Sequence, residues 1–141
     1  MTRRPYVDLH RLRSLLQEHF SWSTWADRIE QNGITIDRPR GSAHPDYPSV
    51  IYPLNYGYIP NTVGPDGEPV DVFVGTADVG LVGALLTTDY RQETYDLKFL
   101  VDCTPAEVYT AHGFINYDRT LLEGVLVLRH PMPTLWAMVD S

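Results

Sequence analysis

The chain has 141 residues and a net charge of −7; 43% of its residues are hydrophobic and 21% are charged. This predicts one globular domain, because domains usually hold roughly 100 to 200 residues. The lone cysteine, Cys103, excludes an internal disulfide, and no apolar run reaches the length of a signal peptide or a membrane span. We therefore expect a cytoplasmic protein that does not enter a membrane.

The negative charge is concentrated in the middle of the chain. Residues 1–40 carry seven arginines against five acids, whereas residues 41–118 carry eleven acids against only Arg91 and Lys98. So acidic a stretch repels the phosphates of nucleic acids and anionic lipids, so we expect neither as a partner. Carboxylates are also the ligands that hard divalent cations need. The alternative is a solvated acidic surface that keeps the protein in solution.

Residues 1–33 are predicted to form a helical extension. Asp8 can cap a helix whose apolar residues recur at helical spacing, and the pattern ends at Gly33: Leu9, Leu12, Leu15, Leu16, Phe20, Trp22, Trp25 and Ile29. We expect this apolar stripe to pack on the chain's own core. A contact in a homo-oligomer is the alternative.

Residues 34–141 are predicted to form the main domain. Seven of the eleven prolines lie between Pro39 and Pro69, which excludes a helix there. Thr104 and Glu107 form the pattern of a capping box, which opens one short helix that Gly113 is expected to end. Strands are predicted at 70–74, 81–87, 95–101 and 124–128. The fold class is therefore α+β and mainly β, a small barrel or curled antiparallel sheet with flanking helices.

The strongest local motif is the acidic turn that runs from Asp66 to Asp71. Gly67 permits a tight turn, and the turn brings Asp66, Glu68 and Asp71 together at one end of a strand. Three carboxylates this close repel one another unless cations or protons intervene, which favours a metal site. An ordinary hairpin turn is the alternative. The motif lacks the glycine and glutamate that an EF-hand loop requires.

A second group of candidates lies in the next two strands. Asp96 and Lys98 alternate with apolar residues, so they share one face of their strand, and Asp89 ends the strand before it. A cross-strand ion pair on the surface is the alternative for Asp96 and Lys98. The tyrosine-rich segment 52–60 is typical of an aromatic core, although phenol hydroxyls also donate well to phosphate oxygens.

The order of these pieces resembles that of the soluble family I inorganic pyrophosphatases. The matching pieces are the Tyr56-Gly57-Tyr58 segment, the turn from Asp66 to Asp71, and then Asp89 and Asp96-x-Lys98, within a resemblance that covers roughly residues 34–129. The resemblance implies a small closed, OB-like β-barrel of about five strands with flanking helices. It also implies magnesium-dependent hydrolysis of pyrophosphate in an acidic cavity, with Mn²⁺ as a substitute metal, and a homo-oligomer.

The resemblance also assigns roles to residues of this chain. It implies five metal ligands: Asp37, Asp66, Asp71, Asp89 and Asp96. Glu68 is expected to activate the attacking water, with Lys98 and Tyr56 as further catalytic residues. Four residues are expected to bind the substrate's phosphates: Arg40, His44, Tyr117 and Arg119.

The sequence departs from the family pattern at several of these positions. The hairpin that follows the Asp37 segment is almost deleted, and a family lysine and glutamate are lost with it. His44 stands at an arginine position, with Arg40 nearby, and Glu68 replaces an aspartate. The family lysine that follows the tyrosine is Asp118 here, with Arg119 one step on. Two alternatives therefore stay open: a non-catalytic protein that binds metal and phosphate, and a hydrolase of another phosphoanhydride.

Overall fold

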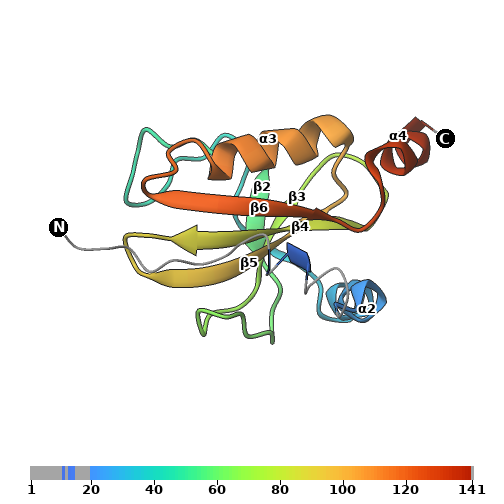
Figure 1. Ribbon diagram of the computed structural model, residues 1–141, viewed down its shortest axis with the longest axis horizontal. Coiled ribbons are helices and arrows are strands. Elements are labelled where there is room, and N and C mark those ends of the chain that lie inside the picture. The colour runs from blue at the N-terminus through green and yellow to red at the C-terminus, as the bar shows by residue number, and fades with distance from the viewer. Residues whose placement is uncertain (1–10, 12, 15–19, 141) are drawn as a thin grey trace.

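A computed structural model describes residues 11, 13, 14 and 20–140 (Figure 1). Its elements, in chain order, are α2 (Trp22–Asn32), β1 (Thr35–Arg38), β2 (Asn55–Tyr58), β3 (Asp71–Val74), β4 (Leu81–Asp89), β5 (Thr94–Val101), α3 (Pro105–Ile115), β6 (Leu122–Leu128) and α4 (Met132–Asp140). The residues predicted to open the chain's first helix, Asp8, Leu9, Leu12, Leu15 and Leu16, lie outside the described part. No helix in the described part combines the length and apolar character needed to cross a bilayer.

The strands form one mixed sheet in the order β1-β2-β3-β5-β4-β6. Only β3 and β5 run parallel, and their register sets Asp71 opposite Lys98. Every other neighbouring pair is antiparallel. The two edge strands, β1 and β6, are not paired with each other in the described residues. The sheet thus has six strands and is open, whereas the sequence predicted a closed barrel of about five; the mainly β class with flanking helices is confirmed.

A hydrophobic core lies on each face of the sheet. One core packs under α3 and α4 and includes Phe73, Leu100 and Val108. The other core includes Val72 and Phe99 and packs under α2, which crosses the opposite face in Figure 1. Side chains alternate between the two faces of a strand, so successive side chains of β5 point into different cores.

The predicted ends of the helices are mostly confirmed. Gly33 ends α2, as predicted, with φ +74°, whereas the N-cap of α2, Ser21, was not predicted. The stripe residue Trp25 packs on Phe99, with ring centroids 4.9 Å apart, as expected for a stripe that covers the chain's own core. The Thr104–Glu107 capping box is present in α3. The predicted stop at Gly113 is wrong, because α3 continues to Ile115 and buries that side chain in the core.

Three elements were not predicted from the sequence: β1, β2 and α4. Strands β1 and β2 have four residues each and lie beside the proline-rich segment, so their pattern is too short to distinguish from loop. The C-terminal helix α4 carries a proline in its first turn, which is a permitted place for it, and buries only Leu135.

Gly57 allows β1 and β2 to pair closely. A Cβ at this position would lie 1.9 Å from the backbone oxygen of Thr35. A Gly57→Ala substitution should therefore lower the free energy of unfolding by about 1–3 kcal/mol, since backbone has to move to admit the methyl group. Urea unfolding measures this change.

Gly113→Ala is the matched control. Gly113 lies within α3, and a Cβ there meets nothing within 4 Å. This substitution should leave stability unchanged or raise it by about 0.5–1 kcal/mol, because alanine is the better helix former. Equal losses in both variants would contradict the close pairing of β1 and β2 as the reason for Gly57.

Candidate active site

Four polar side chains from three adjacent strands meet on the sheet face that α3 covers: Tyr56, Asp71, Asp96 and Lys98, here called the acid–lysine cluster. The Lys98 Nζ donates to Asp96 Oδ2 at 2.7 Å, to Asp71 Oδ2 at 2.9 Å and to the Tyr56 hydroxyl at 2.8 Å. The Tyr56 hydroxyl in turn donates to Asp71 Oδ2 at 2.7 Å. All three ammonium hydrogens therefore have partners within the cluster.

The cluster is buried. Lys98 is only 9% exposed, and its alternation with Leu100 in β5 places it beside the core under α3. The alternative of a surface ion pair between Asp96 and Lys98 is therefore wrong. A lysine held between two carboxylates in a partly buried site is costly to remove, because the carboxylates would lose their counter-ion.

The two carboxylates compete for this single cation. Burial, together with the negative charge of Asp71, raises the pKa of Asp96 to about 6, against the attraction of Lys98. Burial opposes ionisation of Asp71 as well, but Lys98 and the Tyr56 hydrogen bond outweigh it and lower the Asp71 pKa. Asp71 is thus the carboxylate that stays ionised, and Asp96 is the one that takes up a proton first.

Burial and charge also fix the states of the other two members. Burial is the largest influence on the Lys98 pKa and lowers it, but Tyr56, Asp71 and Asp96 together raise that pKa well above its usual value. Burial raises the pKa of Tyr56. At neutral pH Lys98 is therefore an ammonium ion and Tyr56 a neutral hydroxyl donor.

A second group of residues adjoins the cluster through Tyr56. Arg38 extends from β1, where it pairs with Tyr56, and its guanidinium donates to the hydroxyl of Tyr52. The guanidinium carbon lies 5.4 Å from the ring centroid of Tyr52 and 5.8 Å from that of Tyr56. The ring of His44 stacks on that of Tyr52, with ring centroids 6.2 Å apart. The Arg38 guanidinium and the Tyr52 ring thus adjoin the cluster through the ring of Tyr56, which is itself a member of the cluster.

The acidic turn before β3 stays outside the cluster. Asp66 Oδ1 accepts a hydrogen bond from the Glu68 backbone at 3.0 Å, as in an ordinary capped turn, and both side chains are exposed. Neither forms a hydrogen bond or ion pair with the cluster in the part of the chain that is described. The expected convergence of Asp66 with Asp71 and Asp96 is therefore not found there.

Two other expected metal ligands also lie apart. Asp89 ends β4, accepts hydrogen bonds from the backbones of Arg91 and Gln92, and forms an ion pair with Arg91 at 3.7 Å. Asp37 is exposed at the irregular position of β1, between residues that pair with β2. The structure therefore brings together two of the five expected ligands, Asp71 and Asp96.

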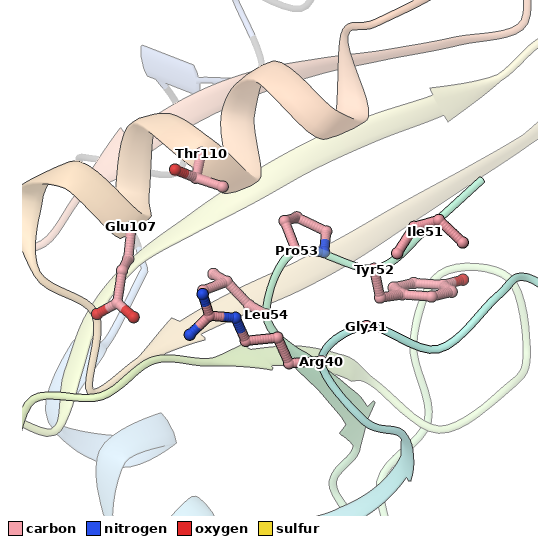
Figure 2. Close-up of a pocket in the computed structure, with 8 residues that line it drawn as sticks. All are labelled: Arg40, Gly41, Ile51, Tyr52, Pro53, Leu54, Glu107 and Thr110. Atoms are coloured by element: carbon pink, nitrogen blue, oxygen red, sulfur yellow. The ribbon is translucent and has the colours of Figure 1, made fainter. Parts of the chain in front are cut away.

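The four expected phosphate-binding residues occupy different places. His44 contacts Tyr52, as described above. Tyr117 is 93% exposed, and Arg119 is exposed beside it in the segment between α3 and β6. Arg40 lines a separate pocket of about 420 Å³ and points across it toward Glu107, as Figure 2 shows. Tyr52 is shared by this pocket and the contacts of Arg38.

A divalent cation fits the donor chemistry of the cluster in part. Asp71 and Asp96 are hard oxygen donors that already share one cation, and Mg²⁺ usually takes one or two protein carboxylates and keeps several waters. Across residues 11, 13, 14 and 20–140, no group of three or more His, Cys, Asp or Glu side chains is placed to hold a metal ion. The pair therefore offers a water-rich site and not an all-protein cage.

Comparisons with known proteins agree with this picture. The sequence model described as inorganic pyrophosphatase matches residues 29–90, which include β1, β2 and β3. An inorganic pyrophosphatase of Nanoarchaeum equitans is 33% identical over 94 residues, which cover 60% of this chain and 57% of the relative. The chain is similar to the inorganic pyrophosphatase family over these segments. A second relative, from Aeropyrum pernix, is 48% identical over 40 residues, which cover 28% of this chain and 23% of that protein.

The fold agrees with the family as well. The inorganic pyrophosphatase structure from Helicobacter pylori has a TM-score of 0.54 and 18% identity, and the match covers 76% of this chain and 90% of that chain. At this identity the likeness concerns the fold alone. The sequence matches to the two relatives span between 23% and 57% of their lengths, so the family's activity is carried to this chain as a proposal.

Arg38 is the site residue that sequence reasoning missed. It lies one position after Asp37, in a strand of four residues that was not predicted. Simple alternation along this segment does not assign the side of Arg38, because the pairing with β2 shifts register between Ile36, opposite Gly57, and Arg38, opposite Tyr56. Without the β1–β2 pairing, no local pattern brings Arg38 to the site.

Proposed function

We propose that this chain hydrolyses inorganic pyrophosphate to two phosphates with Mg²⁺, or Mn²⁺ in its place, held at Asp71 and Asp96. The observation that carries the proposal is the pair of carboxylates that shares one buried ammonium, in a chain whose residues 29–90 match the inorganic pyrophosphatase model. Its cytoplasmic location and its assembly as a homo-oligomer stay predictions.

The reaction adds one water across the phosphoanhydride. The water oxygen bonds to one phosphorus, the bridging P–O bond breaks, and the bridging oxygen leaves on the other phosphate. Such transfers depend mainly on positioning and on neutralising charge. A bound Mg²⁺ would supply charge neutralisation and lower the pKa of a coordinated water.

The chain's own residues supply the positioning and the proton transfer. Lys98 holds Asp71 and Asp96 in one orientation, since one nitrogen bonds to both. Tyr56 stays protonated, so its hydroxyl remains a donor beside the site. Glu68 is the proposed acceptor of the water's proton, and Asp66 holds its turn by accepting a hydrogen bond from the Glu68 backbone N–H.

Phosphate release distinguishes the possible substrates. We expect two phosphates per pyrophosphate with Mg²⁺ present, and rates on ATP and on tripolyphosphate at least about tenfold lower. Faster release from ATP would replace pyrophosphate with another phosphoanhydride as the substrate. No release from any of the three would overturn the proposed hydrolysis.

A non-catalytic protein that binds metal and phosphate is the second candidate. The observation that favours it is the position of Asp66 and Glu68, both exposed and without a contact to the acid–lysine cluster in the described residues. In that case Mg²⁺ and phosphate would bind, and pyrophosphate would stay intact over hours.

Metal binding should depend on pH with a definite sign. A proton on Asp96, whose pKa is raised to about 6, competes with the cation. We therefore expect the dissociation constant for Mg²⁺ to be nearly constant above pH 7 and to rise by up to about tenfold per unit below pH 6.

Thermal unfolding at several Mg²⁺ concentrations measures this affinity, because a ligand that binds only the folded state raises the melting temperature. Asp96→Asn is the control and should flatten the pH dependence while weakening the binding. A melting temperature that does not change with millimolar Mg²⁺ at pH 8, with and without phosphate, would contradict the metal site at Asp71 and Asp96.

A further inference from the structure

Arg38 is a cation that aromatic side chains hold in place and that has no ion-pair partner among the described residues. Its guanidinium lies over the rings of Tyr52 and Tyr56 and donates to the Tyr52 hydroxyl. Within the described residues it forms no ion pair, and its only hydrogen bond to another side chain is the one to Tyr52. A guanidinium has five N–H donors, so most of the Arg38 donors remain available to a ligand.

Its surroundings favour the charged form without neutralising it. Burial lowers the pKa of Arg38, but the hydrogen bond to Tyr52 and the neighbouring tyrosines outweigh this and raise it. The adjacent Asp37 also raises this pKa, and within the described residues the two side chains do not form an ion pair. A partly buried guanidinium held by phenols is stabilised further when an anion binds to it.

Arg38 is close to the proposed metal site. The Tyr56 ring lies 5.8 Å from the guanidinium carbon of Arg38 and 5.3 Å from the Nζ of Lys98. Lys98 uses all of its hydrogens within the acid–lysine cluster, so it has none left for a ligand unless the cluster rearranges. Among the described cations next to Tyr56, Arg38 is therefore the one with free donors, and Lys98 is not.

The neighbouring histidine does not take over this role. Burial is the largest cause that lowers the His44 pKa, and the charge of Arg38 lowers it further. The His44 Nδ1 also accepts a hydrogen bond from the Asp46 backbone at 3.0 Å. His44 is therefore neutral at neutral pH, which leaves Arg38 as the charged donor next to Tyr52.

We propose that Arg38 binds the phosphate oxygens of the substrate, with Tyr52 and Tyr56 fixing the plane of its guanidinium. The planar fork suits two oxygens of one phosphate group. This role rests on the proposed function, because the anion is the phosphoanhydride that is hydrolysed at Asp71 and Asp96. Arg38 would bind the substrate equally well in the ground state and in the transition state.

Substitution of Arg38 tests this role. Arg38→Met should raise KM for magnesium pyrophosphate by about 10- to 100-fold, because charge-assisted hydrogen bonds are lost, while kcat changes only a few-fold. Arg38→Lys keeps the charge without the fork and should fall between Met and the parent. If Arg38→Met fails to fold, the KM of Arg38→Lys tests the role of Arg38 in its place.

Arg28→Met is the matched control. The Arg28 guanidinium also lies over an aromatic ring, 4.6 Å from the Trp25 centroid, but it belongs to α2 on the other face of the sheet. Its loss should leave KM and kcat unchanged. If Arg38 only packs against the tyrosines, both arginine variants would lower the melting temperature, and neither would change KM.

A binding measurement separates this inference from the proposed hydrolysis. Inorganic phosphate with Mg²⁺ should raise the melting temperature of the parent, and Arg38→Met should lose most of that shift. This result supports the role of Arg38 even if the parent hydrolyses nothing. An active parent whose Arg38→Met and Arg38→Lys variants keep the parental KM overturns the role of Arg38 and leaves the hydrolysis standing. A parent that neither turns over pyrophosphate nor responds to phosphate overturns both.

Discussion

A Lys98→Met variant should lose about 3 kcal/mol of unfolding free energy and at least about a hundredfold in turnover. The stability falls because Asp71 and Asp96 keep their contact but lose the ammonium that lies 2.9 Å from one and 2.7 Å from the other. Turnover falls because the two carboxylates no longer hold one orientation. Urea unfolding and phosphate release measure the two effects.

The pH and metal dependence of this variant give a second check. Without Lys98 the two carboxylates raise each other's pKa above the unfolded value, so the folded state gains stability from protonation at low pH and loses it as the pH rises. The stability deficit should therefore be larger at pH 8 than at pH 5, and Mg²⁺ should reduce it at pH 8. Lys98→Arg keeps the charge and should lose less stability. A Met variant as stable as the parent at pH 8 without metal, with unchanged kinetics, would contradict the buried cluster.

Replacing Glu68 with Gln should lower kcat by about a hundredfold or more and leave Mg²⁺ binding nearly intact. Glutamine keeps the size of the side chain but cannot accept the water's proton. Glu68 is exposed, so the free energy of unfolding should change by less than about 0.5 kcal/mol. A loss of turnover therefore reports on chemistry and not on folding.

Glu68→Asp is the conservative variant. It shortens the side chain by one methylene and keeps the base, so activity should be retained or raised. If Gln is as active as Glu, the water is activated without this carboxylate. If Gln and Asp fall equally, the length of the side chain matters more than its basicity, which also contradicts a simple proton acceptor.

The sequence predicted the long elements of this fold because their patterns are local. The capping box of α3 and the glycine that ends α2 each act within a few residues. Strand β4 is long enough to show a continuous apolar run, and β5 is long enough to show alternation of polar and apolar residues. Strand β1 gave no such signal, because its four residues are held by pairing with β2, 21 residues further along the chain in the case of Gly57 and Ile36.

The contacts of the site that lie within one strand could be predicted from the sequence. The contacts between different strands could not. The alternation in β5 predicted that Asp96 and Lys98 share a face, and the structure confirms it with a 2.7 Å contact. Their burial was not predictable, because it depends on α3 and on the parallel pairing of β3 with β5. Arg38 reaches the site only through the β1–β2 pairing, which no local pattern encodes.

Phosphate release from magnesium pyrophosphate by the parent and by the Asp71→Asn and Asp96→Asn variants tests whether the two carboxylates form the active site. We expect steady release by the parent and a loss of about a hundredfold or more in each variant, because each removes one of the two carboxylates that meet at Lys98. An inactive parent, or variants that release phosphate as fast as the parent, would contradict an active site at Asp71 and Asp96.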